Sequence, residues 1–193
     1  MTDLLLVHHI QGLTPGVLAF ADALRAGGHT VHTPDLFDGR TFDSIDDGFA
    51  HARSVGVDAV RAPALAAADD LAGGFVVAGI SFGVMAALQL ATGHPGVAGA
   101  LLYEGFADPA EFAGWPDGLP AQVHGMDADP FFAEEGDLAA ARAFAEGHDG
   151  VEVFTYPGAV HLFTDASLPG HDAEATGLVV QRSLALLDSL GRR

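Results

Sequence analysis

The pentapeptide Gly79-Ile80-Ser81-Phe82-Gly83 constrains this chain more than any other segment because of what flanks it. A short apolar run at 75–78 precedes it, and an apolar stretch poor in glycine at 84–91 follows it. This pattern predicts a strand, a sharp turn with serine at its apex, and a helix, which is typical of a nucleophile elbow. The alternative is a glycine-rich turn with an inert serine, so the interpretation depends on partner residues elsewhere in the chain.

Apolar runs and helical patterns alternate along the rest of the chain. Strands are predicted at 4–7, 29–33, 97–103, 120–124 and 151–156, and helices at 15–25, 49–71 with a break at Pro63, 138–146 and 173–190. Continuous apolar runs indicate parallel strands buried on both faces. We therefore predict a single α/β domain over residues 1–193, a mostly parallel sheet of about six strands with helices on both faces. Ligands bind such sheets at the carboxyl ends of the strands.

Composition limits the chemistry that this chain can perform. The sequence contains no Cys, which excludes a cysteine nucleophile and a thiolate metal site, and no Lys, which excludes a Schiff base. The formal net charge of −18 disfavours nucleic acid and anionic membranes, since both require clustered basic residues. The apolar run at 4–7 is too short for a signal peptide or a membrane span, so we expect a cytoplasmic protein. Nothing in the sequence indicates the oligomeric state.

A serine hydroxyl needs a base to take its proton, and the base needs a carboxylate to orient it. In hydrolases built on such a sheet the chain order is serine, acid, histidine. His161, in the loop after the last strand, is the candidate base. Three acids remain open: Asp127 and Asp129 follow the fifth strand, and Glu104 follows the fourth. Spacing favours Asp129 slightly, while Asp127 could equally be a turn residue.

The chain has ten histidines, which raises the question of a metal site. His8, His9, His124 and Asp127 all lie at predicted strand ends and could converge. Adjacent residues such as His8 and His9 point to opposite faces if the strand continues, and no His-Glu-x-x-His helix is present. We predict no metal and no cofactor.

The sequence resembles the dienelactone hydrolase family, in a short form, over nearly its whole length. The resemblance implies an α/β-hydrolase fold, a Ser81–Asp129–His161 catalytic triad, and an oxyanion hole formed by the backbone N–H groups of Phe82 and Ile10. It rests on the segments 34–37 (PDLF), 79–83 (GISFG), 124–132 (HGMDADPFF) and 156–163 (YPGAVHLF).

Three departures from the family pattern bear on the substrate. Ser81 stands where the family has a cysteine, His9 where it has a glutamate, and Asp165 where it has an arginine that holds the substrate carboxylate. His9, Glu104 and Asp165 are accordingly candidate pocket residues. We expect hydrolysis of a small, soluble, neutral ester or lactone through an acyl-enzyme, because a substrate carboxylate would meet a like charge at Asp165. The alternative is an inactive hydrolase-fold protein that binds or regulates.

Overall fold

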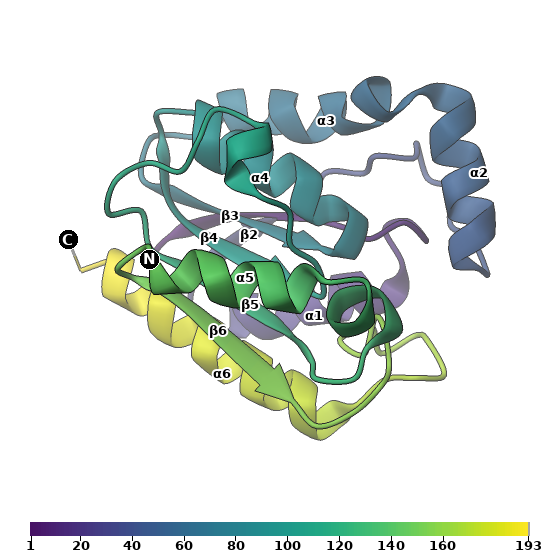
Figure 1. The fold of residues 1–193 in the computed structure, drawn as a ribbon. Coiled ribbons are helices and arrows are strands. Elements are labelled where there is room, and N and C mark those ends of the chain that lie inside the picture. Colours follow the sequence, from purple (N-terminus) through teal and green to yellow (C-terminus); the bar gives the residue numbers. More distant parts are fainter. Residues whose placement is uncertain (193) are drawn as a thin grey trace.

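The structure is a computed structural model, and it describes residues 1–192. Its centre is a six-stranded sheet in the order β2-β1-β3-β4-β5-β6, in which every neighbouring pair is parallel. This confirms the predicted sheet (Figure 1). The strands are β1 (Asp3–Val7), β2 (Thr30–His32), β3 (Phe75–Ile80), β4 (Val97–Tyr103), β5 (Ala121–Met126) and β6 (Val151–Tyr156).

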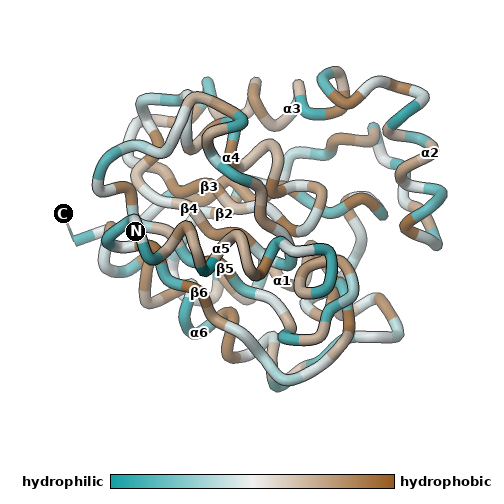
Figure 2. Tube along the Cα trace, viewed as in Figure 1, coloured by the Kyte–Doolittle hydropathy of each residue, from teal (hydrophilic) through white to brown (hydrophobic). Residues whose placement is uncertain are grey.

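Helices cover both faces of the sheet (Figure 1). On one face α1 (Pro15–Ala26) and α6 (Ala173–Leu190) pack through Phe20 and Val179, among others. On the other face α3 (Val57–Asp69), α4 (Val84–Gly93) and α5 (Asp137–Glu146) pack through Leu88 and Ala141, among others. The strands between these layers are apolar along most of their length (Figure 2). The long apolar runs in the sequence thus become a sheet that is buried on both sides.

The predicted helix at 49–71 with a break at Pro63 is wrong in its boundaries. Two helices lie here, α2 (Ile45–Val55) and α3, and they meet at Gly56, whose φ of 97° only glycine adopts readily. Pro63 lies inside α3 and removes one backbone donor without ending the helix. The start is earlier than predicted because the Ser44 side chain accepts a hydrogen bond from the Asp47 N–H and caps α2.

The strand order changes direction between β1 and β3. The chain moves from β1 outwards to β2 on one side, then crosses back to β3 and continues through β4, β5 and β6 on the other side. The loops that leave the carboxyl ends of β1 and β3 therefore diverge and open a crevice. Those two loops begin with His8 and Ser81, so the fold puts the elbow at this crevice. Among residues 1–192, the structure contains no helix both long and apolar enough to span a membrane.

Candidate active site

Ser81 lies at the apex of a tight turn between β3 and α4. Its φ is +48°, a left-handed conformation unusual for a residue with a side chain. A Cβ added to Gly79 would lie 2.4 Å from the Gly83 carbonyl oxygen, and one added to Gly83 would lie 2.4 Å from the Val7 carbonyl oxygen. Neither position can hold a side chain, so both glycines of the pentapeptide are required by the close approach of the backbone.

Ser81, His161 and Asp129 form one hydrogen-bonded chain. The Ser81 Oγ lies 2.8 Å from His161 Nε2, and His161 Nδ1 lies 2.7 Å from Asp129 Oδ2. Asp129 is fully buried, whereas Ser81 and His161 are partly exposed. The carboxylate holds the Nδ1–H tautomer, which leaves Nε2 free to accept the serine proton. The three residues come from the loops after β3, β5 and β6, in the order expected for a serine hydrolase.

Asp129 owes its fixed position to a short turn that the sequence analysis did not predict. Its second oxygen, Oδ1, accepts hydrogen bonds from the N–H groups of Phe131 at 2.8 Å and Phe132 at 3.3 Å. Asp129 thereby caps a π-helical turn, Pro130–Glu134, that has Pro130 in its first position. An aspartate followed by proline is a recognisable start signal for a helical turn, and it could have singled out Asp129.

The two other candidate acids lie elsewhere. Asp127 is exposed, and its Oδ1 accepts a hydrogen bond from the Gly158 N–H at 3.1 Å, which ties the loop after β5 to the loop after β6. Glu104 is buried at the end of β4, and it bonds the Thr164 N–H rather than His161. Of the three acids, only Asp129 therefore hydrogen bonds to His161.

A cavity of about 160 Å³ opens beside Ser81 and His161. Ile10 lines it next to the serine, and the sequence analysis had also singled out Glu104, which lies in its wall. The sequence analysis did not identify two further acids of the lining, Glu135 and Asp137, or the other lining residues, most of which are apolar. Asp137 could have been identified from the sequence. It lies in the first turn of the helix that follows β5, and such a helix begins near the carboxyl ends of the parallel strands. The remaining lining residues are Ile45, Phe49, Val84, Met85, Gly105, Phe106 and Phe131.

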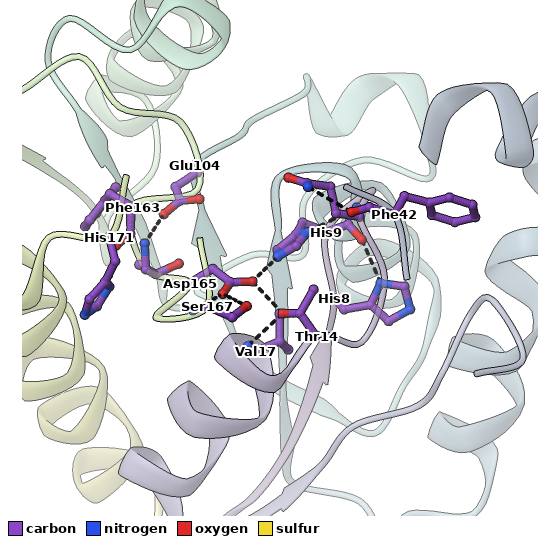
Figure 3. Close-up of polar contacts among 12 residues, drawn as sticks. His8, His9, Thr14, Val17, Phe42, Glu104, Phe163, Asp165, Ser167 and His171 are labelled. Atoms are coloured by element: carbon purple, nitrogen blue, oxygen red, sulfur yellow. Dashed lines mark hydrogen bonds and ion pairs between the residues drawn. The ribbon is translucent and has the colours of Figure 1, made fainter. Parts of the chain in front are cut away.

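His9 and Asp165, predicted as pocket residues, do not line this cavity. Both are buried and bond one another, with His9 Nε2 2.8 Å from Asp165 Oδ2 (Figure 3). Asp165 also accepts hydrogen bonds from the Thr14 hydroxyl at 2.5 Å and from the Ser167 N–H at 2.7 Å. The side chain turns inwards because Gly16 leaves room: a Cβ there would overlap Asp165 Oδ1. The expected charge at the family's arginine position is therefore absent from the pocket.

The buried pair joins the loop after β1 to the loop that carries His161. The Gln11 N–H donates to His9 Nδ1 at 3.2 Å, so Nε2 carries the proton that bonds Asp165. Burial alone would raise the pKa of Asp165, but hydrogen bonds from His9, Ser167 and Thr14 outweigh it and lower the pKa to about 2. Asp165 is thus a negatively charged residue whose hydrogen bonds hold the two loops together.

The remaining strand-end histidines are also occupied by hydrogen bonds. His8 donates through Nδ1 to the His9 carbonyl oxygen and accepts the Leu36 N–H at Nε2. Burial lowers the pKa of His8 to about 4 and that of His124, which bonds Tyr156 and Gln122, to about 3. Within residues 1–192 no three His, Cys, Asp or Glu side chains gather closely enough to hold a metal ion.

The sequence analysis named Ile10 and Phe82 as backbone donors to an oxyanion, and of these two the cavity lining contains Ile10 but not Phe82. Phe82 directly follows the serine in the first turn of a helical segment, where backbone N–H groups lack intrahelical partners. Ile10 lines the cavity with Ser81. Helix α2 packs closely against the Ile10 carbonyl group, since a Cβ at Gly48 would lie 2.1 Å from the Ile10 carbonyl oxygen. Helix α2 therefore packs against the carbonyl side of the residue whose N–H is the candidate donor.

A parallel sheet, a serine on a strained turn after β3 and a histidine bonded to a buried aspartate after the later strands together are typical of the α/β-hydrolase fold. A family model described as the dienelactone hydrolase family matches residues 3–190, and the chain belongs to this family of hydrolases. A comparison with curated proteins gives no match.

Solved structures share the fold at low identity. One is a dienelactone hydrolase-like promiscuous phosphotriesterase, P91, from metagenomic libraries, with a TM-score of 0.74 and 20% identity over 98% of this chain and 87% of that one. Another is esterase 2 of Thermogutta terrifontis phosphoramylated by tabun, with a TM-score of 0.62 and 16% identity over 98% and 83%.

Proposed function

We propose that this protein hydrolyses a small carboxylic ester or lactone through a covalent acyl-enzyme on Ser81. The observation that carries the proposal is the hydrogen-bonded chain from Ser81 through His161 to Asp129 at the wall of a cavity. No metal ion or cofactor takes part in the mechanism proposed.

His161 Nε2 takes the Ser81 proton as the serine oxygen attacks the substrate carbonyl carbon. The negative charge that forms on the carbonyl oxygen is held by the backbone N–H groups of Ile10 and Phe82. As this intermediate collapses, the carbon–oxygen bond to the alcohol breaks and His161 returns the proton to the departing oxygen. Water then attacks the acyl-serine with His161 again as base, which releases the acid and regenerates Ser81.

The cavity restricts the substrate by size. Its volume of about 160 Å³ is close to that of an engineered protein cavity of about 150 Å³ that binds benzene. A group of about six non-hydrogen atoms therefore fills it. The aromatic rings of Phe49 and Phe131, each more than a third exposed, stand in its wall and favour an apolar group at that side.

The test replaces the nucleophile. Ser81→Ala should lower turnover of short p-nitrophenyl esters by about 10³-fold or more and abolish labelling by a fluorophosphonate, with the fold intact. One neighbour in the fold is phosphoramylated by tabun, which favours an organophosphorus probe here. Ser54→Ala, at an exposed helical serine, is the matched control and should retain both properties.

Two outcomes would contradict the proposal. Activity above about a tenth of wild type in Ser81→Ala would exclude the nucleophilic role. A wild-type protein that neither hydrolyses the ester and lactone panel nor reacts with the fluorophosphonate would instead be an inactive hydrolase-fold protein that binds or regulates.

A further inference from the structure

Glu104 has a carboxyl oxygen, Oε2, with no hydrogen-bond partner among residues 1–192, and the nearby Thr164 hydroxyl has none either. The residue directly follows β4 in a left-handed conformation, with φ of 58°, and is only 1% exposed. Its Oε1 accepts the Thr164 N–H at 3.1 Å, whereas Oε2 is buried and has no hydrogen-bond partner (Figure 3). Buried polar atoms without partners are uncommon, and each calls for a physical reason. Because Glu104 lines the cavity beside Ser81, a bound ligand can provide that partner.

Within residues 1–192, the surroundings of Glu104 contain two further acids and the catalytic candidate His161, but no arginine. Glu135 and Asp137 share the cavity with it, and no arginine lines the wall among the described residues. Burial raises the pKa of Glu104 to about 7, opposed by nearby His161 and Thr164 and reinforced by Asp129. Burial also raises the pKa of Asp137, with Glu135 and Asp129 adding repulsion. A cation with a proton to donate would relieve both the repulsion and the unsatisfied oxygen.

We propose that the cavity binds a protonated amine of the substrate, whose N–H donates to Glu104 Oε2. This inference rests on the proposed function and makes the substrate a small amino-substituted ester or lactone. A neutral hydroxyl could satisfy the oxygen, but it would leave three neighbouring carboxyl groups without a positive charge. A small alkylammonium also fits the available volume of about 160 Å³.

The first experiment compares two acetate esters of the same shape. Protonated 2-(dimethylamino)ethyl acetate and neutral 3-methylbutyl acetate differ only in having N–H or C–H at the branch point. Wild type should show a kcat/KM about tenfold or more higher for the ammonium ester, as expected for a hydrogen bond to a charged group. Glu104→Gln should lower this ratio by about tenfold or more.

A matched control separates this contact from bulk charge. Glu134→Gln makes the same charge change at an exposed glutamate that does not line the cavity, so it should retain the wild-type ratio. The ammonium group also makes the alcohol a better leaving group, so part of the preference belongs to the ester itself. Equal kcat/KM for the two esters in wild type, or the same ratio in Glu104→Gln as in wild type, would overturn the inference. In that case hydrolysis of both esters would leave the proposed function standing.

A binding measurement tests the inference without turnover. Titration calorimetry with ethyldimethylammonium should give saturable binding to wild type and Glu134→Gln, and loss of binding in Glu104→Gln. Absence of binding to wild type would overturn the inference, whatever the activity. Binding in a protein that hydrolyses neither ester would support the ammonium site while the proposed function failed.

Discussion

Asp127 and Asp129 are two positions apart but have different partners. Asp129 is buried against His161, whereas Asp127 is exposed and bonds the Gly158 N–H. Asp129→Asn should therefore lower kcat by up to about 10⁴-fold, because an amide in that place favours the wrong imidazole tautomer. Asp127→Asn should cost only a few-fold, since an amide oxygen can still accept the Gly158 N–H. Ester hydrolysis by the two purified variants checks the assignment, and equal losses would contradict it.

Glu104 should make stability depend on pH in a direction opposite to that of most acids. Burial raises its pKa to about 7 from the ordinary 4.5. Below pH 4.5 the Glu104 carboxyl is protonated in both the folded and the unfolded state, so its burial does not lower the free energy of unfolding. As the pH rises towards 7 the unfolded chain loses this proton first, and the folded state loses stability on the order of 3 kcal/mol.

Glu104→Gln should remove this loss because glutamine does not ionise. The fold should be kept because the amide oxygen can still accept the Thr164 N–H. Denaturant unfolding of wild type and Glu104→Gln at several pH values measures the difference in free energy of unfolding. We expect the free energy of unfolding of Glu104→Gln to increase relative to that of wild type as the pH rises from about 4.5 to 7. Glu134→Gln is the control. A constant difference across this range would mean that the Glu104 pKa is not raised.

Helix α2 is the element that supports the candidate oxyanion donor. Few of its residues are buried, and one of these, Gly48, packs on the Ile10 carbonyl oxygen at a distance that excludes a Cβ. Gly48→Ala should therefore displace the backbone at Ile10, its N–H included, and lower kcat by about 10-fold or more, since a misplaced oxyanion donor can cost 10²-fold. KM should change less because the cavity wall remains.

Gly177→Ala is the matched control, because Gly177 lies within α6 with open space at its Cβ position. That change should leave kcat unaltered and stabilise the protein by about 0.5–1 kcal/mol. Steady-state kinetics and thermal unfolding of both variants decide the matter. Wild-type kcat in a folded Gly48→Ala protein would show that α2 does not hold the Ile10 donor.

At the level of elements, the sequence predicted features that depend on local patterns. The elbow, most of the strands and α6 have strong local signals, namely paired glycines, apolar runs and a periodic face. The sequence predicts a helix break at Pro63 because proline disfavours helix interiors, but the break lies at Gly56, whose positive φ glycine adopts readily. The end of β5 extends two residues beyond the prediction, to Met126.

Contacts between distant segments were harder to predict from the sequence. Asp165 lies four residues after His161 and was expected in the pocket, yet its partner His9 is 156 positions away in the chain. The space that draws Asp165 inwards is created by Gly16, on a different element. Glu135 and Asp137 line the cavity only because the Pro130–Glu134 turn packs on β5 and α5 packs beside that turn and β6. The positions of these side chains depend on how distant segments pack together, and the periodicity of a single segment carries no information about that packing.

Taken whole, the molecule carries a large negative charge, and three acids line its candidate site. The formal net charge is −18, and the acids of the cavity have no arginine among them in the described residues. The repulsion first predicted from Asp165 is thus expected from Glu104, Glu135 and Asp137 instead. Two like charges about 4 Å apart near a protein surface repel by a few kcal/mol, and more distant charges add a part that salt screens.

A lactone that bears a free carboxylate should therefore be a poorer substrate than its methyl ester. We expect kcat/KM for hydrolysis of the lactone ring to be about tenfold or more lower for the free acid at low ionic strength, since each 1.4 kcal/mol is a factor of ten. Added salt should narrow the gap without closing it, because screening reaches surface charges more than buried ones. A higher kcat/KM for the free acid would instead indicate a cation near the substrate. Arg61 would then be the residue to replace, since it lines a neighbouring cavity that shares Met85 with this one.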